Sequence, residues 1–296
     1  MSAERIKVVV TGASGLLGRA VAEEAARRGH TVIGTALTRA TGGLVRVDLS
    51  DTAATESFLE EQQPQAIIHC AAEKRPDVAE GNQAAVEQLN AQTPGMLAAA
   101  AKRLGAYMVY VSTDYVFDGT KPPYHVGDRT NPLNFYGKTK LAGEQAVLAA
   151  NEDAAVLRIP VLYGKGAPAE SAVNALVELV NATEPTTVDA RQLRSPTCTD
   201  DVARVLVDMA QQRPAGGIYH FSAPEQMTKY DMCRTFADIL GVGATSMLVP
   251  ATAKPQSPVA DRPDNPQLAT DALERAGISV SCVPFRQWWS AHLRQP

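Results

Sequence analysis

Cysteine is scarce in this chain of 296 residues, which contains four of them. They stand at positions 70, 198, 233 and 282, so no two form the C-x-x-C pair that is typical of zinc sites and thiol exchange. Such dispersed cysteines also argue against a disulfide framework, which small secreted proteins use. We therefore expect free thiols in a reducing cytoplasm, and no metal site.

Long apolar runs are missing, and neither sign of charge dominates. No run approaches the roughly 20 apolar residues that a membrane-spanning helix needs, and the stretch 6–10 is too short for the core of a signal peptide. The formal net charge is −4, which gives no support for nucleic-acid binding or for attraction to an anionic membrane. These absences predict a soluble, cytoplasmic protein that binds neither nucleic acid nor a membrane.

Glycine, in contrast, is concentrated near the N-terminus, in the sequence TGASGLLG at 11–18. The valines before this segment predict a buried strand, and the residues after it have the pattern of a helix. Gly12 would permit a tight turn, Gly15 would let backbone approach a pyrophosphate, and Gly18 would let the helix lie close to the strand. The free N–H groups at the helix start would then face the phosphates. A plain turn is the alternative, but the position favours a dinucleotide site.

The rest of the chain alternates short apolar runs with helical patterns. We predict an α/β fold, a Rossmann-type doubly wound parallel sheet with a smaller C-terminal substrate-side lobe. The expected strands are 31–34, 45–49, 66–70, 107–111, 154–159, 187–189 and 217–222. The expected helices include 52–63, 83–104 (interrupted near Pro94), one opening at 136, 169–181 and 199–212. The predicted domains are 1–160 with 187–222 for nucleotide binding, and 161–186 with 223–296, including a proline-rich loop at 250–266, for the smaller lobe.

The end of the second strand favours NADP (NADPH) over NAD. Folds that prefer NAD usually carry an acidic residue there, which holds the ribose hydroxyls. The segment 34–39 has no acid and ends in Arg39, so a 2′-phosphate would meet a guanidinium instead of a carboxylate. Alternatively, Arg39 is a solvated loop charge. Asp48, at the end of the third strand, could receive the adenine amino group or cap the next helix.

Small residues follow the fourth strand. Ala71 and Ala72 would leave room for the ribose and nicotinamide, because ligands bind at the carboxyl edge of such sheets. His69 is expected to be a packed strand residue rather than a catalyst. Lys74, in the charged loop 73–78, could contact the cofactor or could be solvated.

A tyrosine–lysine pair follows the fifth strand. Tyr136 and Lys140 are four residues apart at the start of a predicted helix, so they share one face of it. The Lys140 ammonium would lower the pKa of the Tyr136 phenol from its usual value of about 10. The phenol could then protonate a carbonyl oxygen while a nicotinamide supplies hydride, and the Thr113 hydroxyl could hold the same oxygen. The pair could also be a surface contact with no catalytic role.

Four stretches together resemble one family, the extended short-chain dehydrogenase/reductases of the group that contains dTDP-4-dehydrorhamnose reductase. The resemblance implies that Thr113, Tyr136 and Lys140 lie at the family's catalytic positions. It also implies an NADPH-dependent reductase of a 4-keto-6-deoxy sugar nucleotide. The stretches are TGASGLLG at 11–18, HCAA at 69–72, STDYVFDGT at 112–120 and YGKTKLAGE at 136–144.

A second resemblance is to the regulatory β subunits of methionine adenosyltransferase. That family has the reductase fold and binds NADP, and its members bind and modulate the catalytic subunit. The similar stretches are RPDVAEGNQAAVEQLN at 75–90, RIPVLYG at 158–164, EQMTKYDM at 225–232 and RPDNPQL at 262–268. The resemblance implies cofactor contacts at Ser14, Gly15, Leu16, Leu17, Leu37, Thr38, Arg39, Asp48, Leu49, Cys70, Lys74, Tyr136 and Leu162. The glycine turn, the strand end and the helix face add Gly12, Gly18, Ala71, Ala72 and Lys140.

Two features separate these functions. The sugar reductases usually carry a tryptophan platform where this chain has Ile159-Pro160, which should weaken sugar-nucleotide binding. The regulatory family has a C-terminal tail that reaches into the catalytic subunit, and we expect this chain to lack it. We predict a regulatory, NADP-binding subunit that associates with methionine adenosyltransferase, with an active reductase as the alternative. Trp288 and Trp289 are expected to pack within an amphipathic last helix, and Arg194 to bind an anion or to lie in a surface salt bridge.

Overall fold

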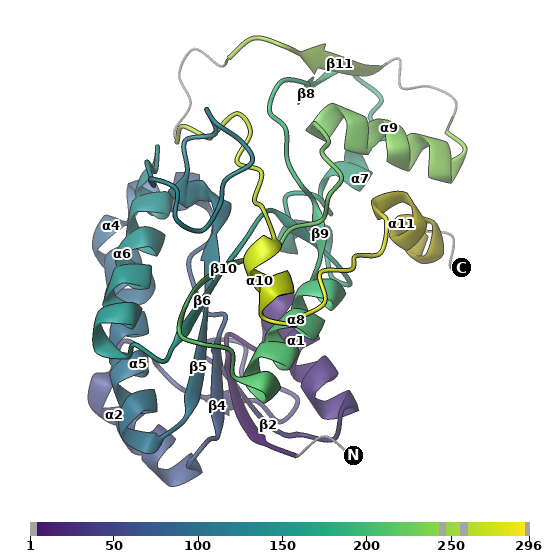
Figure 1. The fold of residues 1–296 in the computed structure, drawn as a ribbon. Helices are drawn as coiled ribbons and strands as arrows, with labels where there is room; N and C mark the ends of the chain where they lie inside the picture. Colours follow the sequence, from purple (N-terminus) through teal and green to yellow (C-terminus); the bar gives the residue numbers. More distant parts are fainter. Residues whose placement is uncertain (1–4, 243–246, 255–259, 294–296) are drawn as a thin grey trace.

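The computed structural model describes residues 5–242, 247–254 and 260–293. Its centre is a parallel sheet of seven strands in the spatial order β10-β6-β5-β4-β1-β2-β3 (Figure 1). The chain starts in the interior of the sheet and then builds outward on both sides, as a doubly wound fold does. The predicted fold class is confirmed. The strands are β1 (Lys7–Thr11), β2 (Thr31–Ala36), β3 (Val45–Arg46), β4 (Ala66–His69), β5 (Tyr107–Thr113), β6 (Ala155–Ile159) and β10 (Gly217–His220).

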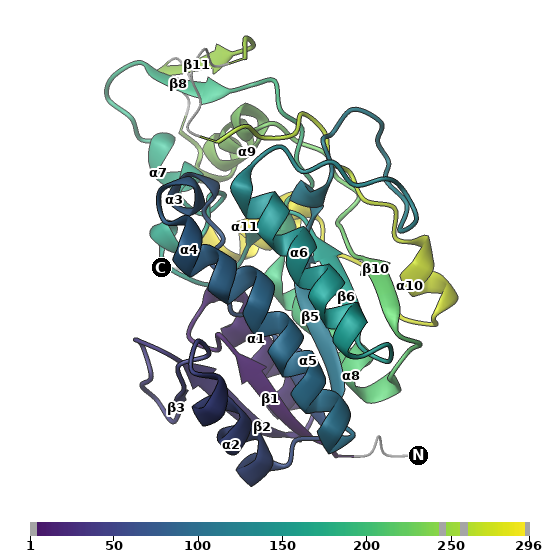
Figure 2. The ribbon, with the colours of Figure 1, turned by 90° about the vertical axis from the view of Figure 1, so that its left-hand side faces the viewer.

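Alternating strand side chains build a core on each face of the sheet. Val8 and Val10 of β1 face the side that α1 and α8 cover, whereas Val9 faces the side that α2, α5 and α6 cover (Figures 1 and 2). These valines are fully buried, so the short N-terminal strand is held from both sides. The helices are α1 (Leu16–Arg27), α2 (Thr52–Gln62), α3 (Pro76–Gly81), α4 (Gln83–Glu87), α5 (Thr93–Leu104), α6 (Phe135–Ala150) and α8 (Thr199–Gln212).

The interruption predicted near Pro94 is present, and the predicted loop 73–78 is shorter than expected. The helix predicted over 83–104 is interrupted before Pro94, by a π-helical stretch at Gln88–Gln92. Pro94 itself lies in the first turn of α5, where its missing N–H costs no hydrogen bond. The predicted loop 73–78 ends early, because α3 begins at Pro76. A proline in the first turn of a helix again costs no hydrogen bond.

A smaller lobe lies beyond the carboxyl ends of the sheet strands (Figure 1). Aromatic side chains fill its core. The ring of Tyr163 lies with its centroid 5.0 Å from that of Phe285 and 5.1 Å from that of Trp288. Trp288 and Trp289 are both buried there, which confirms the predicted packing of the last helix. The elements of this lobe are β7 (Leu162–Tyr163), α7 (Leu176–Leu179), β8 (Thr186–Asp189), β9 (Thr197–Cys198), α9 (Lys229–Leu240), β11 (Leu248–Ala251) and α11 (Phe285–Leu293).

The structure changes parts of the predicted domain division. Strand β8 lies within the predicted nucleotide-binding segment 187–222, but it pairs with β11 outside the large sheet. Helix α10 (Asp271–Arg275) lies within the predicted lobe segment 223–296, but it packs against β10 and the main core. The other boundaries stay predictions. The proline-rich loop predicted at 250–266 includes 255–259, which lie outside the described residues.

The helix predicted over 169–181 is wrong. Only a 3₁₀ turn at Pro168–Glu170 and the four-residue α7 are helical. Ser171 between them is extended, and its hydroxyl donates to the Leu162 carbonyl (2.5 Å) and accepts from the Val173 N–H (3.0 Å). The Asn174 amide donates to the Gly164 carbonyl (2.9 Å). These side-chain bonds to backbone compete with helix formation.

Several other properties of the described ranges bear on function. None of their helices is both long and apolar enough to cross a membrane. All four cysteines are unpaired. Within the same ranges, no group of three or more His, Cys, Asp or Glu side chains is placed to hold a metal ion.

Candidate functional site

The glycine turn connects β1 to α1 at the carboxyl edge of the sheet. Gly12 has φ +68° and lies close to the Ala71 backbone. A Cβ at this position would be only 2.9 Å from the Ala71 Cα, so a larger residue would not fit. A Cβ on Gly18 would be 2.2 Å from the Gly12 carbonyl oxygen. Helix α1 begins at Leu16 with Gly15 as its N-cap, and no side chain caps it. Its first N–H groups, including those of Leu16 and Leu17 after Ser14, can therefore donate to an anion.

The end of β4 lies beside this turn. The Ala71 N–H donates to the Thr11 hydroxyl (3.3 Å), and Cys70, Ala71 and Ala72 are half-buried. The His69 ring is fully buried, shares a 2.6 Å hydrogen bond with Thr11 Oγ1 and stacks on Tyr110. Burial lowers the pKa of His69 to about 3. His69 is thus a packed, neutral strand residue, as predicted.

The segment after β2 is open to solvent. Leu37, Thr38 and Arg39 are exposed, and no acidic residue precedes them in β2. A 2′-phosphate approaching this edge would therefore meet the Arg39 guanidinium without a neighbouring strand carboxylate.

Asp48 does not cap α2. Its carboxylate accepts from the Ser50 N–H (2.9 Å) and hydroxyl (2.6 Å), whereas Asp51 is the N-cap and accepts from the Ala54 N–H (3.0 Å). Leu49 is buried beside it. The capping alternative therefore belongs to Asp51, and the exposed Asp48 carboxylate remains a candidate for the adenine amino group.

The tyrosine–lysine pair lies where β5 meets α6. Asn134 caps α6 by accepting from the Gly137 N–H (2.8 Å), and this fixes Tyr136 in the first turn. Lys140, one turn on, donates to the Val111 carbonyl (2.8 Å) and lies 4.1 Å above the Tyr110 ring. Thr113 ends β5, and its hydroxyl donates to the Asp114 carboxylate (3.1 Å) and accepts from the Tyr115 N–H (3.2 Å).

The expected effect of Lys140 on Tyr136 is wrong in this structure. Loss of water around the phenol raises the pKa of Tyr136 well above 10, and the neighbouring Thr113 hydroxyl offsets only part of this shift. Burial also lowers the pKa of Lys140 to about 7, although Glu144 opposes that change. The Lys140 side chain donates to a β5 carbonyl, and it is not among the groups that shift the pKa of Tyr136.

This burial predicts a pH dependence of stability. The pKa of Lys140 is about 7 in the folded chain against 10.5 normally, so the unfolded chain binds more protons between these values. The free energy of unfolding should therefore rise with pH in that window. In Lys140→Met, chemical denaturation at about pH 7 and about pH 10 should show a smaller rise. Lys138→Met, exposed on the same helix, should keep the wild-type rise; equal pH dependence in all three proteins would contradict the assignment.

A buried ion pair supports this site, and no local pattern identified it. Glu144 lies one turn after Lys140 on α6, and its carboxylate accepts from Arg158 Nη2 (2.6 Å) and Nε (2.9 Å). Ser112 Oγ donates to the same carboxylate (2.5 Å). Both charged side chains are 2% exposed. The available signal is an arginine within the apolar strand run 154–159, because a buried charge requires a partner.

Arg194 lies near the end of β5, beside the ring of Tyr115. Its guanidinium donates to the Pro263 carbonyl (2.9 Å) and Gln192 Oε1 (2.8 Å), and it lies 5.8 Å from the Tyr115 ring. Arg194 is 5% exposed, so the predicted surface salt bridge is wrong. Neutral carbonyl oxygens accept the hydrogen bonds that its guanidinium donates. Asp114, which the sequence reasoning did not single out, is buried nearby, and burial raises its pKa to about 7.

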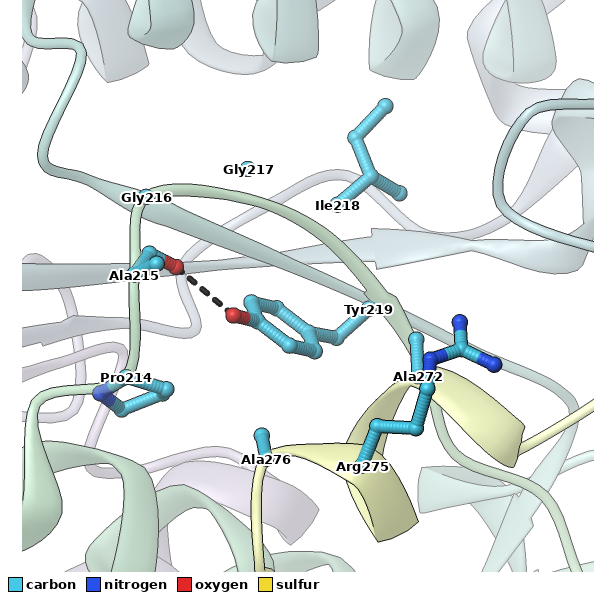
Figure 3. Close-up of a pocket in the computed structure, with 9 residues that line it drawn as sticks. All are labelled: Pro214, Ala215, Gly216, Gly217, Ile218, Tyr219, Ala272, Arg275 and Ala276. Carbon is cyan, nitrogen blue, oxygen red and sulfur yellow. Dashed lines mark hydrogen bonds between the residues drawn. The ribbon is translucent and has the colours of Figure 1, made fainter.

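A cavity of about 490 Å³ lies elsewhere, between the start of β10 and α10 (Figure 3). Figure 3 shows the Tyr219 hydroxyl donating to the Ala215 carbonyl, at 2.7 Å. Gly216 and Gly217 place this cavity at the amino end of a sheet strand, whereas ligands of such sheets bind at the carboxyl ends. None of the predicted site residues lines it.

Comparisons with known proteins agree with this arrangement. The family model described as "RmlD substrate binding domain" matches residues 6–294. The zebrafish (Danio rerio) methionine adenosyltransferase 2 subunit beta is 44% identical over 286 residues, which cover 95% of this chain and 88% of that protein. The dTDP-4-dehydrorhamnose reductase of Mycolicibacterium smegmatis is 35% identical, over 96% of this chain and 83% of that protein.

A solved structure extends the comparison to three dimensions. The dTDP-4-dehydrorhamnose reductase of Bacillus anthracis, crystallised in complex with NADP, superposes with a TM-score of 0.86 and 26% identity, over 98% of each chain. The sequence match and the superposition both span the large sheet and the smaller lobe. The chain therefore belongs to the RmlD substrate binding domain family, and it shares more of its sequence with the zebrafish β subunit than with the mycobacterial reductase.

Proposed function

We propose that this chain is a dinucleotide-binding regulatory subunit that binds and modulates a methionine adenosyltransferase catalytic subunit. The observation that carries the proposal is the 44% identity to the zebrafish β subunit over 95% of this chain. The match runs through both lobes, so it includes the elements that position the cofactor site and the surface of the smaller lobe.

Modulation can be measured directly. Purified chain is added in increasing amounts to a methionine adenosyltransferase catalytic subunit, and S-adenosylmethionine formation is followed over a range of methionine concentrations. We expect a saturable change in the KM for methionine or in the maximal rate. Unchanged kinetics at every ratio of the two proteins would contradict the regulatory function.

We propose NADP as the bound dinucleotide. The uncapped start of α1 suits the pyrophosphate of either dinucleotide, whereas the absence of an acid in β2 and the exposed Arg39 favour NADP. The Bacillus anthracis relative was crystallised with NADP. When bound, the cofactor's pyrophosphate would be held by the N–H groups that follow Gly15, and its 2′-phosphate by Arg39.

Arg39→Ala is expected to weaken NADP binding about tenfold, because a charge-assisted contact to phosphate is lost. NAD, which has no 2′-phosphate, should bind with nearly unchanged affinity. Calorimetric titration of both dinucleotides measures the two effects. Arg27→Ala is the control, since Arg27 lies at the other end of α1 and pairs with Glu24. Equal losses for NADP and NAD would refute the role of Arg39.

A second candidate function is an active NADPH-dependent dTDP-4-dehydrorhamnose reductase. The placement of Thr113, Tyr136 and Lys140 at the junction of β5 and α6 favours it, as does the 35% identity to the mycobacterial reductase. Bound NADPH would supply a hydride to the carbonyl carbon. Tyr136 would donate its proton to the carbonyl oxygen, and its raised pKa keeps that proton in place beforehand.

NADPH absorbance in the presence of dTDP-4-dehydrorhamnose tests the second candidate. Turnover that Tyr136→Phe abolishes would establish it. No turnover, or turnover that Tyr136→Phe leaves unchanged, would exclude this use of the site.

A further inference from the structure

A loop of the smaller lobe lies directly against the start of α1. This loop, residues 164–171, connects β7 to the turn before α7. A Cβ on Gly166 would be 2.8 Å from Leu16 Cδ1 and 3.0 Å from Arg19 Nη2, so the loop backbone closely approaches the first turn of α1. Arg19 Nη2 also donates to the Lys165 carbonyl (2.9 Å). The loop therefore borders the predicted phosphate site.

Three cationic side chains from three different elements converge on one residue of this loop, Glu170. Its carboxylate lies 3.1 Å from Arg19 Nη2 and 3.9 Å from Arg39 Nη1. The Lys74 ammonium donates to the Glu170 backbone carbonyl. Arg19 belongs to α1, Arg39 follows β2 and Lys74 follows β4, so these cations meet only because the sheet brings the three strand ends together.

The Glu170 carboxylate is the anion that pairs with Arg19 and Arg39. Its side chain is 18% exposed, and its carboxylate also accepts from the Ala167 N–H (3.0 Å). Partial burial raises the pKa of Glu170, but the bonds from Arg19 and Ala167 and the charge of Arg39 outweigh this, so the carboxylate is ionised. Arg39, in contrast, is 63% exposed. Its long contact with Glu170 is a partly solvated ion pair, which contributes little to stability.

A phosphate group would bind these cations better than a carboxylate does. It carries nearly two negative charges at neutral pH and offers three acceptor oxygens, and it pairs with guanidinium groups through charge-assisted bonds. We infer that Glu170 competes with the 2′-phosphate of the dinucleotide for Arg39. The Glu170 carboxylate pairs with Arg39 until a phosphate displaces it, and this competition sets how strongly the site prefers NADP over NAD. The inference rests on the proposed cofactor.

Glu170→Gln tests this competition with little change of shape. The glutamine oxygen can still accept from the Ala167 N–H, so the loop keeps that contact, while the negative charge is removed. We expect the Kd for NADP to fall about fivefold at low ionic strength, the upper range for a partly exposed ion pair, and the Kd for NAD to change less than about twofold. Added salt should reduce the difference, because it screens such charges.

The control is Glu178→Gln, which removes the same charge from an exposed position on α7 and should leave both Kd values unchanged. A double variant then tests whether Glu170 acts through Arg39. In an Arg39→Ala background, Glu170→Gln should no longer improve NADP binding, because the cation that Glu170 competes for is gone.

Each other outcome overturns the inference in a distinguishable way. Equal gains for NADP and NAD would mean that Glu170 opposes the pyrophosphate and does not affect the choice of cofactor. Weaker NADP binding by Glu170→Gln would mean that Glu170 positions the arginines for the cofactor. Unchanged NADP binding would mean that the ion pair has no role, while the proposed cofactor stands. No binding of either dinucleotide to any variant or to the wild type would refute the proposed cofactor itself.

Discussion

Replacing Glu144 by alanine should lower the free energy of unfolding by about 3–5 kcal/mol, the usual cost of breaking a buried ion pair. The Arg158 side chain is 2% exposed, and the substitution leaves its guanidinium without a carboxylate. Its remaining polar side-chain contact is His220, whose Nε2 lies 3.3 Å from Arg158 Nη1. Burial and the Arg158 charge lower the pKa of His220 to about 3, so the imidazole is neutral and cannot replace the lost charge.

Urea denaturation followed by circular dichroism measures this effect. Glu152→Ala is the matched control, because Glu152 also pairs with a basic residue, Lys102, but on an exposed surface. We expect that control to have a much smaller effect, since exposed pairs contribute little. Similar midpoints for Glu144→Ala and Glu152→Ala would show that the buried pair does not support the fold as described.

Gly18→Ala should weaken dinucleotide binding about tenfold or more. The added Cβ would lie 2.2 Å from the Gly12 carbonyl oxygen and 2.9 Å from the Ala13 Cα. Both contacts are with backbone, so α1 must move away from the turn, and such overpacking costs about 1–3 kcal/mol. Because the phosphates would bind at the N–H groups between these elements, the shift should disrupt binding of NADP and of NAD alike.

The control for this variant is Gly127→Ala. Gly127 has no heavy atom within 4 Å of its built Cβ, so alanine should be accommodated there without movement. Titration of NADP by calorimetry, with thermal unfolding as a check of folding, compares the two. If Gly18→Ala folds and binds NADP with wild-type affinity, the close approach of turn and helix is not what forms the site.

Much of the sheet could be predicted because its signals are local. The apolar run 66–70, for example, lies between Pro64 and a stretch of small residues. Such a run of apolar residues predicts a buried strand without reference to the rest of the chain. The helix expected at 169–181 failed for the opposite reason. Ser171 and Asn174 bond to the backbone at 162–166, a contact that the residues of 169–181 alone do not reveal.

The candidate site, too, could be predicted only where its signals are local in the sequence. The spacing of Tyr136 and Lys140 placed both side chains on one helix face, and the pattern of glycines placed the turn. The pKa values could not be predicted, because they depend on burial by segments far away in sequence: Lys140 bonds to Val111 of β5. Glu170 was likewise missed, since its three cationic neighbours are brought to it by the sheet and not by sequence spacing.

The intact catalytic candidates do not by themselves decide between the two proposed functions. A tyrosine, a lysine and a threonine arranged for proton donation suit a reductase, but the regulatory resemblance includes the same tyrosine among its cofactor contacts. Sequence similarity to the β subunit, 44% against 35% for the mycobacterial reductase, favours regulation. A physical association with a catalytic subunit separates the two functions more sharply than any property of the isolated chain.

Size-exclusion chromatography of this chain mixed with a methionine adenosyltransferase catalytic subunit measures that association. At micromolar concentration, with NADP present, we expect one earlier peak containing both proteins, since a regulatory subunit must be bound at working concentrations. Two peaks at the elution volumes of the separate proteins, unchanged by NADP, would contradict the regulatory function.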